Sequence, residues 1–204
     1  MPDLFRDKAA DYDSRPVPAQ ISEGVFAALS SRLALHADLT VLDFGAGTGL
    51  VTGKLAPLVK RIHAVDVSPA MLEQLARKAD LAGQVEIHCQ NLLEAPLPLA
   101  VDLVVSAMAM HHVDDTPGLL RALFDHLRPG GQVALADLDA EDGDFHPADV
   151  EGVFHRGFDR DALGRLMAEV GFTHVTFATA CDVHRDGRHY PVFLVTATRP
   201  SVPA

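Results

Sequence analysis

Three glycines at alternate positions follow an apolar segment that contains a single acid. The segment from Val41 to Leu50 reads V-L-D-F-G-A-G-T-G-L and places glycines at 45, 47 and 49. Glycine adopts positive φ angles easily and, because it lacks a Cβ atom, lets a ligand approach the backbone closely. The pattern therefore predicts a buried strand, a tight ligand-binding turn, and a helix that begins near Leu50.

The spacing of these glycines separates two classes of nucleotide-like ligand. A dinucleotide fingerprint has the form G-x-G-x-x-G and places a pyrophosphate on a helix N-terminus. Here the position three after Gly47 is Leu50, and Asp43 stands two residues before the first glycine. A carboxylate at that point suits a cationic or amine-bearing ligand better than a diphosphate. The turn thus predicts a ligand without phosphate, and an NAD-dependent oxidoreductase is the weaker alternative.

A second acid ends the next apolar segment. Asp66 follows R-I-H-A-V at 61–65, about 20 residues beyond the first glycine. At this offset a carboxylate can accept both hydroxyl groups of a ribose. Asp66 is therefore the strongest single candidate for a ligand contact.

Together these motifs resemble those of the class I S-adenosylmethionine-dependent methyltransferases, whose first motif has the form acid-x-G-x-G-x-G. The resemblance continues through C-Q-N-L at 89–92, V-D-L-V-V-S at 101–106, and L-R-P-G-G followed by Q-V-A-L-A-D at 127–137. It covers about residues 38–198, and it implies S-adenosylmethionine as the cofactor. Within the family, the chain is similar to the small-molecule group that includes quinone-biosynthesis C-methyltransferases.

The resemblance also implies which residues bind the cofactor. In the family, the acid at position 66 binds the adenosyl ribose, and the block at 89–92 meets the adenine edge, with Asn91 where aspartate is commoner. The residues expected to bind the cofactor are Asp43, Gly45, Ala46, Gly47, Asp66, Val67, Met71, Asn91, Leu92 and Ser106.

Two adjacent histidines, His111 and His112, follow the fourth predicted strand. Methyl transfer is a direct displacement at a sulfonium carbon, so alignment and desolvation are the enzyme's main tasks. A base is useful when the acceptor loses a proton, and neutral imidazole is a competent base near pH 7. We predict these two histidines as the catalytic residues, with a hydrogen bond to a backbone carbonyl as the structural alternative. His146 is a weaker candidate.

No metal ion is expected from the sequence. The residues just before the histidine pair, Ala107 to Met110, offer no oxygen ligands for magnesium. The two cysteines, Cys89 and Cys181, lie far apart and lack the spacing of a thiolate zinc site.

The chain from Thr40 onward alternates apolar strands with amphipathic helices, which predicts a Rossmann-like, doubly wound, mostly parallel α/β sheet. Strands are expected at about 39–44, 61–66, 84–89, 101–106 and 132–137, and helices at about 49–59, 69–80, 116–128 and 159–170. The resemblance adds a final hairpin over 172–198, which gives seven strands with the last one antiparallel. Ligands of such sheets lie at the carboxyl ends of the strands.

One structural domain is expected, with two segments added to the sheet. Residues 1–37 form an N-terminal helical cap with helices near 4–12 and 19–35, and residues 38–204 form the methyltransferase domain. Within it, residues 139–157 read as a loop with one short helix that covers the substrate cavity as a lid. A purely structural insertion is the alternative for this segment.

The amino-acid composition limits the kinds of molecule that the chain is expected to bind. The net charge of −11 disfavours nucleic acid, because phosphate contacts need clustered Lys and Arg. No apolar run is long enough to cross a bilayer, and the N-terminal M-P-D-L-F-R-D-K lacks the apolar core of a signal peptide. We expect a cytoplasmic protein that acts on a small-molecule acceptor, and its oligomeric state stays open. A catalytically inactive S-adenosylmethionine-binding partner or regulatory subunit is the alternative function.

Overall fold

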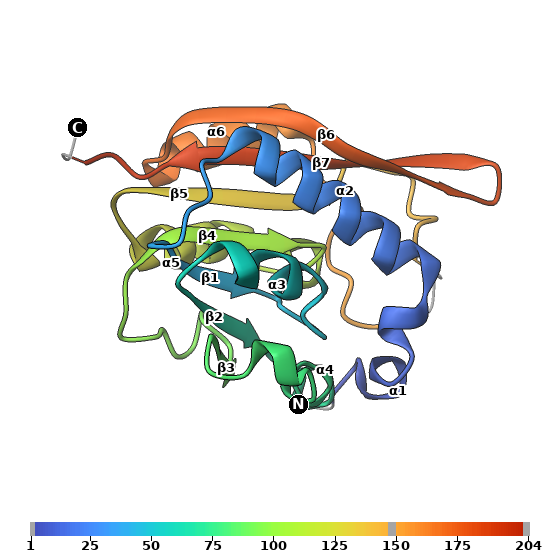
Figure 1. Cartoon of the computed structure of the whole chain (residues 1–204). Helices are drawn as coiled ribbons and strands as arrows, with labels where there is room; N and C mark the ends of the chain where they lie inside the picture. Colours follow the sequence, from blue (N-terminus) through green and yellow to red (C-terminus); the bar gives the residue numbers. More distant parts are fainter. Residues whose placement is uncertain (1–2, 147–149, 202–204) are drawn as a thin grey trace.

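The computed structural model describes residues 3–146 and 150–201. Within these ranges seven strands form one sheet: β1 (Thr40–Phe44), β2 (Arg61–Asp66), β3 (Val85–Cys89), β4 (Val101–Ala107), β5 (Leu127–Leu138), β6 (Thr173–Arg185) and β7 (Arg188–Thr198). Their order across the sheet is β3-β2-β1-β4-β5-β7-β6 (Figure 1). Neighbours among β1 to β5 pair in parallel, whereas β7 runs antiparallel to β5 and β6. The predicted Rossmann-like sheet and its antiparallel last strand are confirmed.

Helices cover both faces of this sheet. They are α1 (Arg6–Ala9), α2 (Pro16–Arg32), α3 (Leu50–Leu55), α4 (Pro69–Ala76), α5 (Thr116–His126) and α6 (Arg160–Val170), with 3₁₀ turns η1 (Tyr12–Ser14), η2 (Ala56–Leu58), η3 (Ala79–Leu81) and η4 (Met110–His112). One apolar core lies between the sheet and α2, α3 and α4, and a second lies between the sheet and α5 and α6. In the described part of the chain, no helix combines the length and the hydropathy needed to span a bilayer.

The helices begin at residues that cap them. The Ser68 hydroxyl accepts the backbone N–H of Met71 at 3.2 Å, and Pro69 occupies the first turn of α4. Asp115 and Asp159 cap α5 and α6, each by accepting a backbone N–H at 2.8 Å. The helix predicted from residue 69 begins there, and α6 lies where the sequence placed it.

Strand β5 extends further than predicted. β5 already begins at Leu127, because the R-P-G-G segment pairs with the chain after β7. Gly130 N donates to Arg199 O, and Arg199 N donates to Gly131 O, both at 2.8 Å. The β6–β7 hairpin lies within the predicted range of 172–198, and Figure 1 shows it projecting beyond the rest of the sheet.

The N-terminal cap contains less helix than predicted. In residues 3–15 only α1 is α-helical, and a residue before it is tied to the main domain: the Asp3 carboxylate accepts the Ser68 hydroxyl at 2.8 Å and the Ala70 N–H at 3.1 Å. The short helix predicted for the lid is absent from residues 139–146 and 150–157. Residues 147–149 of that segment lie outside the described part of the chain.

The carboxyl ends of the parallel strands bring the candidate residues to one edge of the sheet. The glycine turn follows β1, Asp66 ends β2, His111 follows β4, and Asp137 lies at the end of β5. In Figure 1 this edge faces α1 and the connection between β5 and α6. These residues therefore share the edge at which ligands of such sheets bind.

Candidate active site

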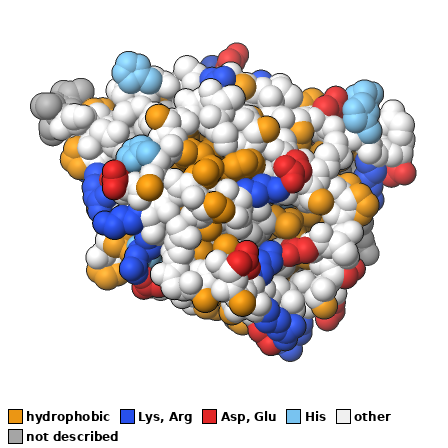
Figure 2. Space-filling model, viewed as in Figure 1, with side chains coloured by type: hydrophobic (Ala, Val, Ile, Leu, Met, Phe, Trp, Pro, Cys, Tyr) orange, Lys and Arg blue, Asp and Glu red, His pale blue; other side chains and the backbone are white. Residues whose placement is uncertain are grey.

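A cavity of about 1160 Å³ lies at this edge of the sheet. Its walls come from the glycine turn, the start of α4, the N-terminal cap, the segment after β4 and the connection between β5 and α6. Figure 2, in the same view as Figure 1, shows hydrophobic side chains gathered in the middle of the molecule, with charged side chains beside them. A cavity of this size can hold a cofactor and a second molecule beside it.

The glycine turn is shaped to accept a ligand. The N–H groups of Gly45 and Ala46 both donate to Val65 O, at 2.8 and 3.0 Å, which fixes the turn to β2. A Cβ atom on Gly45 would collide with Ala109, so this position requires glycine for packing. Gly47, with φ of 55°, has open space where its Cβ would lie, and it lines the cavity. The missing side chain of Gly47 therefore leaves room for a bound molecule.

Asp66 is held in position at the cavity wall. Its Oδ2 accepts the Gly47 N–H and its Oδ1 accepts the Ser68 N–H, both at 2.8 Å. Burial raises the pKa of this carboxyl above its usual value, although these backbone hydrogen bonds act in the opposite direction. The carboxylate thus links the glycine turn to the start of α4.

Asp43 lies beneath the same turn and is 2% exposed. Its Oδ2 accepts the hydroxyl of Thr52 on α3. Burial raises the pKa of Asp43 to about 7, and the nearby charge of Asp66 acts in the same direction. A cationic group bound in the cavity would favour the ionised form of this carboxyl.

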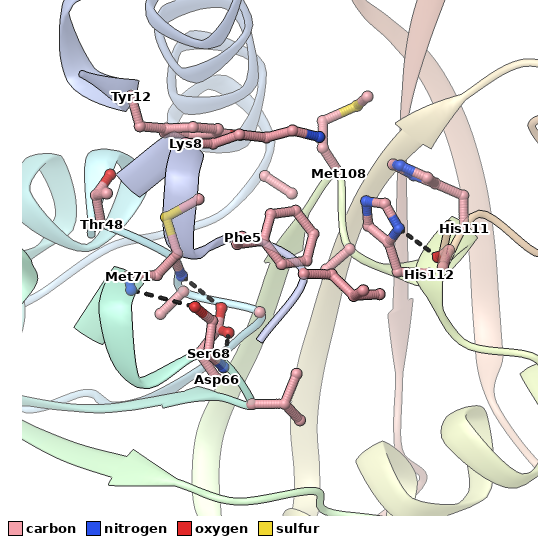
Figure 3. A pocket seen from close by; sticks show the side chains of 18 of the residues that line it. Phe5, Lys8, Tyr12, Thr48, Asp66, Ser68, Met71, Met108, His111 and His112 are labelled. Carbon is pink, nitrogen blue, oxygen red and sulfur yellow. Dashed lines mark hydrogen bonds between the residues drawn. The ribbon is translucent and has the colours of Figure 1, made fainter. Parts of the chain in front are cut away.

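The N-terminal cap is tied to the two loops that surround these acids. Asp3 bonds to Ser68 and Ala70 at the start of α4. Asp13 accepts the Thr48 hydroxyl from the glycine turn and pairs with Lys78 at 2.7 Å. Figure 3 shows the cap residues Phe5, Lys8 and Tyr12 in the same view as Asp66 and Ser68, and all of them line the cavity.

His111 forms a buried pair with Asp137. Its Nδ1 lies 2.7 Å from Asp137 Oδ1, and its backbone N–H donates to Asp137 Oδ2 at 3.2 Å; the two side chains are 1% and 0% exposed. Because a carboxylate accepts, Nδ1 carries the proton and Nε2 has a free lone pair. His111 Nε2 lies 3.2 Å from Nε2 of His146, which is then the donor. Asp137 therefore fixes both the orientation and the tautomer of His111.

His112 is positioned separately. Its Nδ1 donates to Gly152 O at 2.7 Å, and the Phe5 ring meets it edge-on with ring centres 5.2 Å apart. Figure 3 shows the ring between Phe5 and His111. Burial, reinforced by the neighbouring His111, lowers the pKa of His112 and of His146 to about 4, so both rings are neutral at pH 7.

Most of the residues predicted to bind a cofactor line this cavity: Asp43, Gly45, Ala46, Gly47, Asp66, Val67, Met71 and Asn91. Leu92 and Ser106 do not line it. Leu92 is buried in the core on the α5 side of the sheet, and the Ser106 hydroxyl is buried within β4. The Asn91 side chain bonds to Glu94 at 2.9 Å and to the Leu93 N–H at 3.1 Å, which shapes the turn after β3.

Sequence reasoning missed Asp137 as the partner of His111 and Asp3 as an anchor of the cap. A signal for Asp137 was present, because it ends a buried strand as Asp66 does. Asp3 gave no such signal, since its partners lie 65 and 67 residues away along the chain.

Two comparisons of the sequence with known proteins bear on this site. The family described as "Methyltransferase domain" matches residues 41–131, from β1 into β5. A methyltransferase of Geobacillus thermodenitrificans is 31% identical over 202 residues, which cover 86% of this chain and 90% of that protein. The chain belongs to the class I S-adenosylmethionine-dependent methyltransferases. The cofactor of this methyltransferase is accordingly S-adenosylmethionine.

Other relatives of this methyltransferase are longer. The malonyl-[acyl-carrier protein] O-methyltransferase of Halorhodospira halophila is 32% identical over 163 residues, which cover 72% of this chain and 55% of that protein. The match to a methyltransferase of Schizosaccharomyces pombe covers 48% of that protein. The chain therefore spans about half the length of these two relatives.

Solved structures share the methyltransferase fold over nearly the whole chain. A chain from the complex between the Haloferax volcanii Trm112 methyltransferase activator and a methyltransferase superposes with a TM-score of 0.80, at 19% identity over 98% of this chain and 99% of that one. The N-methyltransferase NodS of Bradyrhizobium japonicum, in complex with S-adenosylhomocysteine, superposes with a TM-score of 0.72. It is 19% identical, over 97% of this chain and 95% of that one.

Proposed function

We propose that this methyltransferase transfers the methyl group of S-adenosylmethionine to a protic nucleophile on a small, largely apolar acceptor, with His111 as the general base. The observation that carries this proposal is that His111, which lines the cavity containing the glycine turn, is paired with the buried Asp137. An imidazole oriented by a carboxylate, with its second nitrogen able to accept a proton, is the arrangement that general-base catalysis requires.

The cofactor would lie along the wall formed by the ends of β1 and β2. Gly47 leaves space for its amino-acid part, and the Asp43 carboxylate lies beneath as a counter-charge for the ammonium group. Asp66 would accept the ribose hydroxyls. The adenine would then lie toward Met71 and Asn91, which border the same wall.

The acceptor would occupy the rest of the cavity, beside the histidines. The side chains there are mainly apolar, and they include Phe5, Met108 and Phe145. A quinone-like acceptor fits such a lining, but the relatives described above give that narrower assignment no support. We therefore propose the acceptor class by its chemistry, as an apolar molecule with a hydroxyl, an amine or an acidic C–H.

S-adenosylmethionine supplies a methyl group that is already activated by a sulfonium sulfur. The carbon–sulfur bond would break as the acceptor binds the methyl carbon, which would leave S-adenosylhomocysteine, and His111 Nε2 would take the proton that the acceptor loses. Asp137 stabilises the resulting imidazolium through Nδ1, and Phe5 and the other cap residues exclude water. His146 Nε2 lies 3.2 Å from His111 Nε2, in the place where the protic group of the acceptor would bind. Entry of the acceptor would therefore displace the His146 ring.

A general base at His111 would favour acceptors that must lose a proton over acceptors that are already ionised. The name of the Halorhodospira halophila relative gives a malonyl group as its acceptor, and a carboxylate has already lost its proton at neutral pH. Such an acceptor needs no general base. The His111–Asp137 pair therefore favours a phenol, amine or acidic carbon over a carboxylate for this chain.

The direct test is to incubate the protein with S-adenosylmethionine and matched panels of phenols, amines, acidic C–H compounds and carboxylic acids, and to measure formation of S-adenosylhomocysteine. We expect turnover in one of the first three panels. Tight binding of S-adenosylhomocysteine without turnover in any panel would support the binding-partner alternative. Turnover confined to carboxylic acids would contradict the proposed base.

Cofactor affinity should depend on pH through Asp43. Its pKa lies at about 7, so acid neutralises the counter-charge of the cofactor's ammonium group, and a bound cation must displace a proton. Affinity for S-adenosylhomocysteine should therefore be about 10-fold weaker at pH 6 than at pH 8, as measured by calorimetry. Asp43→Asn is the control, because it should remove this dependence. A wild-type affinity that is the same at both pH values would contradict the role of Asp43.

A further inference from the structure

A cluster of two histidines and one glutamate lies on β2 and β3, away from the active-site cavity. We propose that His63, Glu86 and His88 form a binding site for a divalent transition-metal ion of the Zn²⁺ class. None of the three lines the cavity described above. The site therefore lies outside the proposed methyl-transfer machinery.

Strand pairing places the three side chains together. In the parallel register of β2 and β3, His63 lies beside Glu86. His88 is two residues further along β3, so its side chain projects from the same face of the sheet as that of Glu86. The ligand atoms of the three residues all lie within 4.8 Å of one another.

The distances between these atoms match the ligand shell of one ion. His63 Nδ1 and His88 Nε2 are 3.1 Å apart, and each lies 3.6 Å from an oxygen of Glu86. At a metal–ligand distance of 2.0–2.1 Å, neighbouring ligands of a tetrahedral ion are separated by about 3.3–3.4 Å. A hydrogen bond explains the contact between the rings, but 3.6 Å is too long for the two carboxylate contacts. The three separations are thus close to those between the ligands of a single ion.

The chemistry of the ligands indicates the class of ion. Two imidazole nitrogens and a carboxylate suit Zn²⁺ and its first-row neighbours, whereas Mg²⁺ and Ca²⁺ prefer oxygen ligands throughout. The side chains of His63 and His88 are 10% and 15% exposed, whereas that of Glu86 is 49% exposed. An ion can therefore enter from solvent past Glu86 and keep a fourth position for water.

A second cluster, on the β6–β7 hairpin, provides an internal comparison. It consists of Asp182, His184 and His189, and both of its histidine side chains are 62% exposed. His189 Nδ1 already makes a hydrogen bond of ordinary length, 3.0 Å, with Asp182 Oδ2. Because its rings are more exposed to solvent and less firmly held, this cluster should bind metal more weakly. Variants at His189 are thus matched controls for variants at His88.

An ion at the proposed site would fasten the edge strand β3 to β2. Asp66 follows His63 by three residues, and Asn91 follows His88 by three. The two strand ends are already joined by a hydrogen bond from Gln90 N to Asp66 O at 3.0 Å. The ion would therefore hold together the part of the sheet that ends at the cofactor wall.

The test is titration of chelator-treated, full-length protein with Zn²⁺ by calorimetry and with Co²⁺ by visible absorption. We expect one tightly bound Zn²⁺ per chain, an increase in Tm, and the strong Co²⁺ absorption of a four-coordinate site. His88→Gln and Glu86→Gln should each weaken Zn²⁺ binding at least about 10-fold, and His189→Gln should leave this affinity unchanged. Binding of S-adenosylhomocysteine by every variant checks that it is folded.

A substitution of Arg61 should change Zn²⁺ affinity in the opposite direction. Its Nη1 lies 3.4 Å from Glu86 Oε2, so this cation competes with a metal ion for the carboxylate. Arg61→Gln should therefore tighten Zn²⁺ binding. Absence of a saturable site in the wild type, unchanged affinity in both His88→Gln and Glu86→Gln, or loss of the tight site in His189→Gln would each overturn the proposal.

Discussion

Replacing Asp137 with asparagine should lower kcat by about 10²- to 10⁴-fold, the range that a general base contributes. Asp137 now accepts three hydrogen bonds, from the His111 ring, the His111 backbone N–H and its own neighbour Leu138 N. An asparagine amide that donates to His111 Nδ1 would move the ring proton to Nε2, and His111 could then not accept a proton. If the asparagine carbonyl faced the His111 ring instead, the side-chain NH₂ group would face the backbone N–H of His111. Two hydrogen-bond donors would then point at each other.

The measurement is steady-state kinetics with the acceptor found in the panels, combined with calorimetry of S-adenosylhomocysteine binding. Cofactor affinity should stay unchanged, because Asp137 does not line the cavity. His112→Gln is the comparison variant. In the wild type the His112 ring donates to Gly152 O, which gives it a structural role. We therefore expect His112→Gln to increase KM and to lower kcat much less than Asp137→Asn does. Equal losses in kcat for the two variants would show that His111 is not the specific base.

The second large effect is expected at Asp66. A hydrogen bond to a charged group contributes roughly 1.5–3 kcal/mol, so loss of one ribose contact should weaken S-adenosylhomocysteine binding by roughly 10- to 150-fold. Asp66→Ala should fall within this range or beyond it. The reason for a larger loss is structural, because Asp66 also accepts the N–H groups of Gly47 and Ser68.

Calorimetry on Asp66→Ala and Asp66→Asn separates these two contributions. Asparagine keeps an oxygen for one of the two backbone N–H groups but removes the charge. Circular dichroism and thermal unfolding will show whether each variant is folded. If both folded variants bind S-adenosylhomocysteine as tightly as the wild type, Asp66 does not contact the cofactor.

The sheet was predictable because its signals are local. Strands β1 and β2 are short apolar runs, and their acids and the first glycine of the turn lie within or directly beside them in the sequence, as with Asp43, Gly45 and Asp66. A strand end that carries chemistry is therefore visible without knowledge of its neighbours. The seven strands and the antiparallel last strand followed from the family resemblance, and the structure confirms both.

The contacts that complete the site were not predictable, because they depend on register and docking between distant segments. His111 and Asp137 are 26 residues apart, and His146 is 35 residues from His111. The same holds for the proposed metal site, since His63 lies 25 residues from His88 and meets it only through the pairing of β2 with β3. The expectation of no metal ion rested on the residues near the histidine pair and on the spacing of the two cysteines, and it did not consider this pairing.

The attachment of the N-terminal cap has a consequence for the order of events in a catalytic cycle. Asp3 and Asp13 anchor the cap to Ser68 and Thr48, in the same two loops that we propose hold the cofactor. Loading of the cofactor and seating of residues 3–15 should therefore stabilise each other, as thermodynamic reciprocity demands. The acceptor needs Phe5 in place, so we expect sequential kinetics in which S-adenosylmethionine binds first and S-adenosylhomocysteine leaves last.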